Sequence, residues 1–417
     1  KNKKGDMKIL HTADWHLGNS FHGHDRIEEH RHFLSWLIEV LRERMPDVLI
    51  IAGDVYDTPN PAATAEQMLF DFLLQATETV PGLQIVLTAG NHDSAGRIEA
   101  PAELLKRHNI YVRGTIHRVD EDPDFDYYLL PLSRRNSQEA EVVCIALPYL
   151  RSCDYPAGMS TEEGIRYYYD NCMRRLRKSP FKGLPVISAA HFYAAGAAVC
   201  NSEHSERLVV GGQDCVDAEI TACACYTALG HIHKAQRVVG KSEAYYAGSV
   251  LPMSFAEKHY DHGVQCVEVN ENGLQNIVRL NYSPLRSLLT IPEHGAATTG
   301  QVLEAIGALP RRQKNDDGSD WPYLEIRVLE TQPEPSFVTD VNNALADRAV
   351  RLCRIVRELP EVRQHTHENP SVQQLSAMTP REMADSVFQH RYGNPMPQSL
   401  ARRFEEAEAQ AIHTPDE

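Results

Sequence analysis

Runs of apolar residues alternate with amphipathic stretches along the start of the chain. Three short apolar runs predict buried strands, over 8–12, 48–52 and 84–88. The stretches between them carry apolar residues at helical spacing, which predicts helices over 25–44 and 66–76. Strands that alternate with helices in this way are typical of a layered α/β fold.

Beyond Asn109 the apolar runs follow one another more closely. One more long helix is expected over 161–178, and its late turns are basic. Further strands are predicted over 110–112, 141–147, 185–190 and 226–229. We interpret the last three runs as strands of a second sheet stacked on the first, over 244–246, 265–269 and 275–280. The pattern therefore predicts an α/β sandwich of two stacked sheets flanked by helices.

The pattern changes again at Tyr282-Ser283-Pro284, which marks the expected end of a first domain. Beyond it, strands and helices alternate on a smaller scale, as in an independent α/β module, and a stretch without apolar periodicity follows. Thr379-Pro380-Arg381-Glu382 then forms a capping box that begins a helical tail. We expect a first domain, a small module, a linker and a tail, over 7–283, 284–360, 361–378 and 379–417.

The tail consists of two short amphipathic stretches. Met383, Val387 and Phe388 give the first a narrow apolar stripe, and Leu400 and Phe404 lie on one side of the second. Two short helices cannot form a core of their own. Either they pack back on the rest of the chain or they bind a partner, and the pattern alone favours neither.

Polar side chains gather where the predicted strands end. Asp14-Trp15-His16 follows the strand over 8–12, and Gly90-Asn91-His92-Asp93 follows the strand over 84–88. Open α/β sheets build their sites at the carboxyl ends of strands, so we expect such residues to meet. The other three clusters at strand ends are Gly53-Asp54-Val55-Tyr56-Asp57, His191 and His231-Ile232-His233.

These residue types point to two metal ions. Asp14 and His16 are two residues apart, as are His231 and His233, so each pair points to one side of an extended chain. Carboxylate, amide and imidazole ligands without thiolate suit Mn²⁺, Mg²⁺, Fe or Zn²⁺. A carboxylate such as Asp54 can bridge two ions roughly 3.5–4 Å apart, which activate a shared water and clamp a phosphate ester. Each cluster alone has an ordinary structural explanation. The occurrence of all five clusters at strand ends is unlikely to arise by chance.

Composition limits where in the cell the protein is expected and what it binds. No run approaches the roughly 18 apolar residues of a membrane span. No signal peptide is apparent and the nine cysteines form no CxxC pair, so we expect a cytoplasmic protein with reduced thiols. The net charge of −15 argues against a general polyanion binder. Local basic patches at Arg134, Arg135 and 174–182 could still contact phosphates, although a solvated helix face explains the last stretch equally well.

The order of the five clusters resembles the calcineurin-like metallophosphoesterase superfamily, over residues 8 to about 280. Within it, the segments 11–18 and 248–255 resemble the SbcD family of DNA double-strand-break nucleases. The small module and the terminal helices also fit that family, in which the module would be a DNA-contacting capping domain.

The resemblance implies a role for each candidate residue. The ligands would be Asp14, His16, Asp54 and His233 for one ion, and Asp54, Asn91, His191 and His231 for the second. His92 would be a catalytic histidine that is not a ligand and that protonates the leaving oxygen. Asp57 matches the position that orients this histidine, although some nuclease relatives carry His there, and Asp93 is a supporting candidate.

The resemblance also implies an activity and partners. It implies 3′→5′ exonuclease activity on duplex DNA and endonuclease activity on single strands and hairpins, in DNA repair, recombination and replication at the nucleoid. The cofactor would be two Mn²⁺ ions, with Mg²⁺ as the alternative. The partner would be an SbcC-type coiled-coil ATPase in an assembly with two copies of each subunit, and this chain would form a homodimer. The competing hypotheses are a small-molecule phosphodiesterase and a scaffold without activity.

Overall fold

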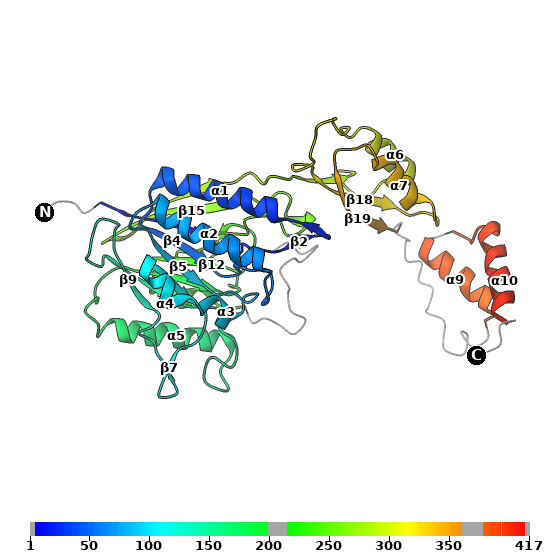
Figure 1. Ribbon diagram of the computed structural model, residues 1–417. Helices are drawn as coiled ribbons and strands as arrows, with labels where there is room; N and C mark the ends of the chain where they lie inside the picture. The colour runs from blue at the N-terminus through cyan, green and yellow to red at the C-terminus, as the bar shows by residue number, and fades with distance from the viewer. Residues whose placement is uncertain (1–4, 199–214, 360–377, 393, 413–417) are drawn as a thin grey trace. The chain divides into compact units, whose positions relative to one another are not determined.

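The computed structural model describes residues 5–198, 215–359, 378–392 and 394–412. The chain divides into two compact units, 1–287 and 288–417, and each is described here by itself (Figure 1). The predicted linker over 361–378 lies outside the described residues, apart from Met378. No helix in the described ranges is long and apolar enough to cross a membrane.

The first unit contains two six-stranded sheets. The order of the first is β16 (Gly273–Asn281), β15 (Gly263–Asn270), β1 (Met7–Thr12), β4 (Val48–Ala52), β5 (Gln84–Thr88) and β6 (Ile110–Arg113). The order of the second is β13 (Gln236–Arg237), β14 (Ala244–Tyr246), β12 (Tyr226–Gly230), β11 (Val186–His191), β10 (Val142–Ala146) and β9 (Leu129–Leu132). From β1 to β6, and from β10 to β14 through β11 and β12, the strands run parallel. Each parallel set therefore brings its carboxyl ends to one edge.

Helices cover the outer faces of both sheets (Figure 1). The helices α1 (Ile27–Arg44) and α2 (Ala63–Thr79) pack on the first sheet, where Trp15 meets Phe33 and Phe72 edge-on, with ring centroids 6.0 and 5.2 Å apart. The helix α5 (Thr161–Leu176) packs on the second sheet. A third core of apolar side chains lies between the sheets. The predicted sandwich of two stacked sheets flanked by helices is confirmed.

The prediction that the runs over 265–269 and 275–280 belong to the second sheet is wrong. β15 pairs antiparallel with β1, with Met7 opposite Val269, and β16 extends the same sheet. Both strands therefore belong to the first sheet and not to the second. The alternation of apolar residues over 265–269 indicates which face of a strand is buried, but it carries no information about the neighbouring strand.

The edge strand β9 was not predicted from the sequence. It contains Pro131, which cannot donate to a ladder and argues against a central strand. In the structure β9 pairs on one side only, antiparallel to β10, so the missing donor costs no hydrogen bond inside the sheet.

In the second unit three parallel strands pair in the order β17 (Leu288–Ile291), β18 (Tyr323–Leu329) and β19 (Arg351–Glu358). The helices α6 (Thr299–Gly307) and α7 (Phe337–Leu345) share an apolar core with this sheet. Along the chain follow α9 (Pro380–Tyr392) and α10 (Gln398–Ile412). The expected capping box is present, since Glu382 N donates to Thr379 Oγ1 and Thr379 N donates to Glu382 Oε2.

Candidate metal centre

The candidate ligands lie at the carboxyl ends of strands from both sheets of the first unit. The first sheet supplies the carboxylates and the amide after β1, β4 and β5. The second sheet supplies three imidazoles, at the end of β11 and just after β12. The first sheet also supplies the imidazole of His16, after β1, so its carboxylates face one imidazole of their own sheet and three of the other.

The backbone at this edge is locally strained. Asp14, His16, Asp54 and His231 have φ values of 53°, 47°, 47° and 106°, a region that side chains with a Cβ rarely adopt. Such conformations persist only where surrounding contacts impose them, and they concentrate at functional sites. A Cβ on Gly230 would collide with the carbonyl oxygen of Ala52, so glycine is required where the two sheets approach each other.

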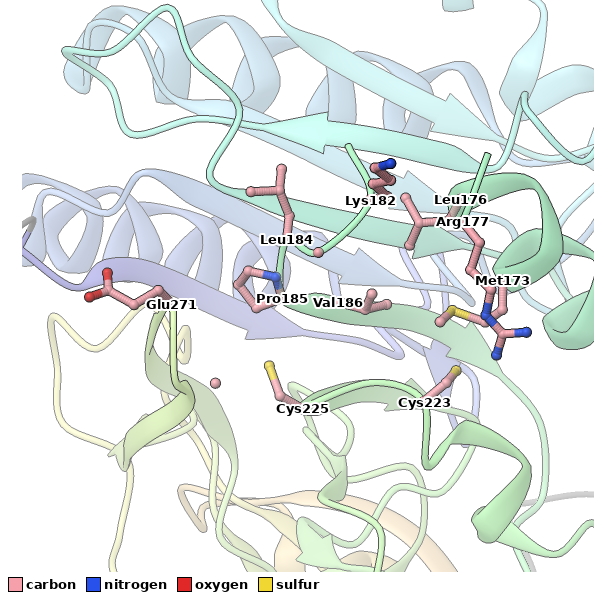
Figure 2. A pocket seen from close by; sticks show the side chains of 12 residues that line it. Met173, Leu176, Arg177, Lys182, Leu184, Pro185, Val186, Cys223, Cys225 and Glu271 are labelled. Atoms are coloured by element: carbon pink, nitrogen blue, oxygen red, sulfur yellow. The ribbon is translucent and has the colours of Figure 1, made fainter. Parts of the chain in front are cut away.

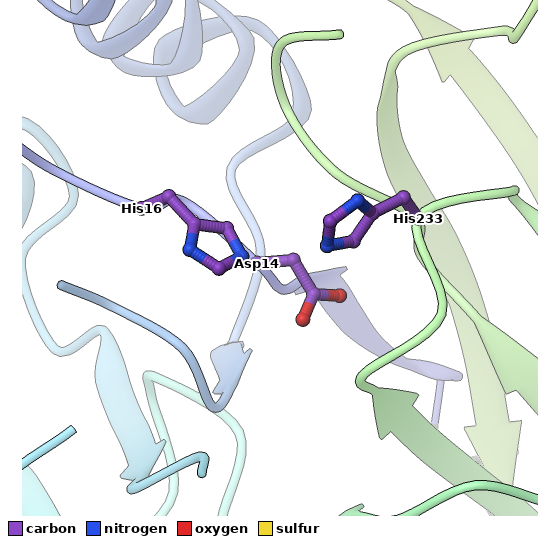
Figure 3. A group of neighbouring side chains, drawn as sticks. All are labelled: Asp14, His16 and His233. Carbon is purple, nitrogen blue, oxygen red and sulfur yellow. The ribbon is translucent and has the colours of Figure 1, made fainter. Parts of the chain in front are cut away.

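Asp14, His16 and His233 form what we call the first half of the candidate metal centre. One ligand atom from each lies within 4.8 Å of the others, and Figure 3 shows the two imidazoles on either side of the Asp14 carboxylate. Asp14 Oδ1 accepts from His231 N at 2.9 Å. Within the described part of the chain, Asp14 Oδ2 and His16 Nε2 are buried without a hydrogen-bond partner, as expected for atoms that bind a cation.

The second half consists of Asn91, His191 and His231. Asn91 Oδ1 lies 2.9 Å from both His191 Nε2 and His231 Nδ1. Asp54 lies between the halves, because its Oδ2 is 3.4 Å from His191 Nε2 and 3.9 Å from His16 Nε2. The donors are oxygens and imidazole nitrogens, so the residues fit two divalent ions with Asp54 shared between them.

The charges at the boundary between the sheets shift several pKa values. Burial alone would raise the pKa of Asp54, but the adjacent imidazole of His191 holds it well below its usual range. Burial alone would lower the pKa of His191, but the Asp54 carboxylate raises it to about 9. Burial, and then the charge of His191, lower the pKa of His231 to about 3. Without metal, the Asp54 carboxylate thus favours the charged form of His191, and burial favours the neutral form of His231.

His92 lies beside the first half, half-buried, with its ring centroid 4.9 Å from that of His16. Its Nδ1 donates to the backbone carbonyl of Asp57 at 2.9 Å. The Asp57 carboxylate points elsewhere, with Oδ1 at 3.3 Å from His16 Nδ1 and 3.0 Å from Asn19 Nδ2. Asp57 thus holds His92 through its main chain, and its side chain meets a candidate ligand.

Asp93 ties together the loops that carry these residues. Its carboxylate accepts from Gly90 N at 2.8 Å, Tyr56 N at 2.9 Å and Val55 N at 3.2 Å. Burial, and then the charge of Asp54, raise its pKa to about 6. Its contacts with three backbone donors make it a support of the loop geometry.

The basic patches lie elsewhere. Arg177 and Lys182 line a pocket of about 410 Å³ with Val186, at the start of β11, and Cys225, just before β12 (Figure 2). These are the amino ends of the strands that carry His191 and His231 at their other ends. Arg134 and Arg135 pair with Glu141 and Asp47. The structure therefore does not bring these arginines to the metal centre.

One buried acid near the centre was missed by the sequence analysis. Glu257 Oε1 lies 3.2 Å from Nδ1 of His233. Its position is just beyond the 248–255 segment that carried part of the family resemblance, but no spacing links it to the histidine.

Known proteins resemble the chain along most of its length. The family model of the calcineurin-like phosphoesterases matches residues 7–234. A second family model, described as a type 5 capsule protein repressor C-terminal domain, matches residues 284–392.

Three relatives are each named as the SbcD subunit of the nuclease SbcCD. The protein from Rhodobacter capsulatus is 33% identical over 92% of this chain and 94% of its own length. The Escherichia coli K12 protein is 27% identical over 98% of each chain. The Bacillus subtilis protein is 34% identical over 78% of this chain and 80% of its own.

Proposed function

Because the chain belongs to the SbcD family of calcineurin-like phosphoesterases, we propose that it is the Mn²⁺-dependent nuclease subunit of a complex that processes DNA ends. The chain is an enzyme of the phosphodiesterase type. The substrate, the metal and the partner are the parts that this proposal adds.

One observation carries the proposal most directly: the seven candidate ligands and His92 come together at one edge of the two sheets. The proposed ligands are Asp14, His16, Asp54 and His233 for one ion, and Asp54, Asn91, His191 and His231 for the other. Two bound divalent ions would supply an activated water and clamp the oxygens of the phosphodiester. The protein itself would supply orientation and a proton donor.

His92 is the proposed proton donor to the leaving oxygen. The Asp57 carbonyl accepts from its Nδ1, so the ring presents Nε2. His92 is half-buried, which leaves it accessible to a substrate. A positioned general acid of this kind contributes about 10²–10⁴-fold to the rate.

The proposed substrates are duplex ends, degraded 3′→5′, and single strands and hairpins, cut internally. The competing function is hydrolysis of a small phosphodiester by the same metals. The deciding experiment offers end-labelled duplex, hairpin DNA and a small chromogenic ester with Mn²⁺, Mg²⁺ or chelator, each with and without an SbcC-type ATPase. Mn²⁺-dependent DNA cleavage supports the nuclease. Turnover of the small ester alone would favour the competing function, and no turnover of any substrate by metal-loaded protein would favour a scaffold.

The proposed partner is an SbcC-type coiled-coil ATPase, with two copies of each subunit and a homodimer of this chain, acting at the nucleoid in repair and recombination. The tail over 379–417 is the proposed docking element. Met383 and Val387 on α9 are 40% and 60% exposed, as apolar anchors for a groove would be. Deleting 379–417 should abolish co-purification of the ATPase and spare the metal content. Unchanged co-purification would contradict the docking role.

A further inference from the structure

The segment 248–257, which we call the strap, packs against the loop that carries His231 and His233. Ser249 N donates to the carbonyl of His233 at 3.0 Å, and the carbonyl of Ser249 accepts from His262 Nδ1 at 2.8 Å. Gly248 has φ +76°, and a Cβ there would come within 2.6 Å of the His233 carbonyl oxygen. The backbone of the strap is therefore fixed against the metal-binding loop at its first residues.

The far end of the strap places a buried carboxylate on His233. The side chains of Glu257 and His233 are 3% and 5% exposed, and Glu257 Oε1 lies 3.2 Å from His233 Nδ1. The second oxygen, Oε2, accepts from Met253 N at 2.8 Å. A buried carboxylate with both oxygens engaged has a fixed orientation, so it constrains the ring that it contacts.

A buried ion network anchors the middle of the strap. Arg26 Nη1 donates to the carbonyl of Pro252 at 2.7 Å. The same guanidinium pairs with Glu29 at 3.0 Å, and Glu29 also pairs with Arg286 at 3.2 Å. All three charged side chains are buried, which is costly unless each keeps its partner. The network therefore holds Arg26, and through it the turn from which Met253 reaches Glu257.

We propose that Glu257 is a positioning residue of the metal centre. It accepts the Nδ1 proton of His233 and thereby fixes the tautomer and the ring orientation in which Nε2 faces the ion of the first half. An imidazole ligand commonly donates its other N–H to such a partner, and loss of the partner typically weakens metal binding by about 10–100-fold. This inference rests on the metal centre under "Proposed function" and adds the residue that makes one of its ligands effective.

The two halves differ in the group that accepts the Nδ1 proton of a histidine ligand. His191 Nδ1 donates to the backbone carbonyl of Ala52 at 3.0 Å, so its support is part of the sheet and survives any side-chain substitution. His233 depends on a carboxylate that is 24 residues away in the chain. Loss of Glu257 should therefore weaken the first half and leave the second half unchanged.

The test is Mn²⁺ binding by the full chain, measured by calorimetry and by the electron paramagnetic resonance signal of coupled Mn²⁺ pairs. The wild type should bind two ions. Glu257→Ala should retain one ion at wild-type affinity and bind the other about 10–100-fold more weakly. Glu257→Gln should lose less, because its amide oxygen accepts the same hydrogen bond without the charge.

The matched control is Glu99→Gln, a buried carboxylate whose partners are Thr115 and Tyr127. It should leave both affinities unchanged, and melting curves without metal compare the folds of all variants. If Glu257→Ala does not fold, Glu257→Gln decides the question, since it conserves volume. Unchanged affinities in both Glu257 variants would overturn the positioning role. A wild type that binds fewer than two ions would contradict the two-metal centre itself. If the remaining ion is weakened by His233→Ala but not by Glu257→Ala, the positioning role of Glu257 is overturned as well.

Discussion

The two halves of the candidate metal centre contain similar residue types but are supported by different parts of the protein. In the first half, the Nδ1 atoms of His16 and His233 face the carboxylates of Asp57 and Glu257, at 3.3 and 3.2 Å. In the second half, Nδ1 of His191 faces the main chain of the neighbouring sheet. Support from the main chain comes with the fold, whereas support from a side chain needs contacts of its own. The first half should therefore be the more sensitive to substitution.

The largest effect is expected where the halves share a ligand. Asp54→Asn should lower the rate of DNA cleavage by about 10³-fold or more. This exceeds the loss that is usual when an enzyme loses a single hydrogen-bond donor to the transition state. It should also weaken both ions, because Asp54 Oδ2 lies between His16 and His191. Cleavage rates and Mn²⁺ titrations check this. The control is Asp47→Asn, a buried acid just before the opposite end of β4, which should bind both ions normally. Loss of a single ion in Asp54→Asn would show that the halves do not share it.

A large loss of rate without loss of metal is expected at His92. His92→Gln should lower the cleavage rate by about 10²–10⁴-fold, as expected for a missing general acid. Both ions should stay bound, because the imidazole is held by the Asp57 carbonyl and takes no part in either proposed ligand set. Single-turnover cleavage and metal content are the measurements. Release of an ion by this variant would instead make His92 a ligand, with the nearby His16, Asp57 and His92 as the group that holds it.

Low pH should lower the stability of the folded protein through His30, a residue that supports the first half. His30 Nε2 donates at 3.2 Å to the carbonyl of Trp15, between Asp14 and His16, and burial followed by the charge of Arg26 lowers the His30 pKa to about 4. The unfolded chain takes up this proton near pH 6.5, so stability falls as pH drops from 6.5 toward 4. At pH 5 the loss is about 2 kcal/mol relative to pH 7. Urea unfolding at both pH values measures it.

A matched variant isolates this contribution. His30→Gln can still donate to Trp15 but does not titrate, so the metal-free variant should lose about 2 kcal/mol less than the wild type between pH 7 and 5. An equal loss in both proteins would assign the acid sensitivity to other groups. His191 has the opposite sign: the stability that it lends the metal-free protein is present below pH 6.5 and is lost as pH rises through about 9.

The smallest effect is expected at Asp57. Its side chain is 24% exposed and stands at ion-pair distance from His16, and the geometry does not make a well-directed hydrogen bond. Asp57→Asn should therefore weaken the first-half ion by about tenfold, at the lower limit for such partners and less than Glu257→Ala. Competitive Mn²⁺ titration of the two variants ranks them. A larger loss of affinity in Asp57→Asn than in Glu257→Ala would show that Asp57 supports the first half more than Glu257 does.

The sequence predicted the strand ends well because polar residues after a buried apolar run occupy a defined edge of a parallel sheet. The runs over 48–52 and 84–88 coincide with β4 and β5, and Asp54 and Asn91 lie just beyond them. Sequence reasoning failed where the answer depends on which segments become neighbours. It placed β15 in the wrong sheet for that reason.

The details around the candidate ligands were also beyond the sequence. Asp57 matched a position that orients His92, but the sequence could not show that its main-chain carbonyl makes the contact. Glu257 could not be singled out, because its relation to His233 arises only when the strap folds behind the β12 loop. Apolar periodicity specifies faces and ends of elements, and contacts between distant loops follow only from the assembled fold.

If the proposed ligands bind metal, their division between two sheets would make the metal supply a factor in the lifetime of the protein. An ion held by Asp54 of one sheet and His191 of the other would bind only when both sheets are packed together, so it would stabilise the sandwich. Free metal at about 100 times the dissociation constant adds about 2.7 kcal/mol to the stability of such a state. A cell short of the metal would therefore lose the enzyme to proteases as well as losing its activity.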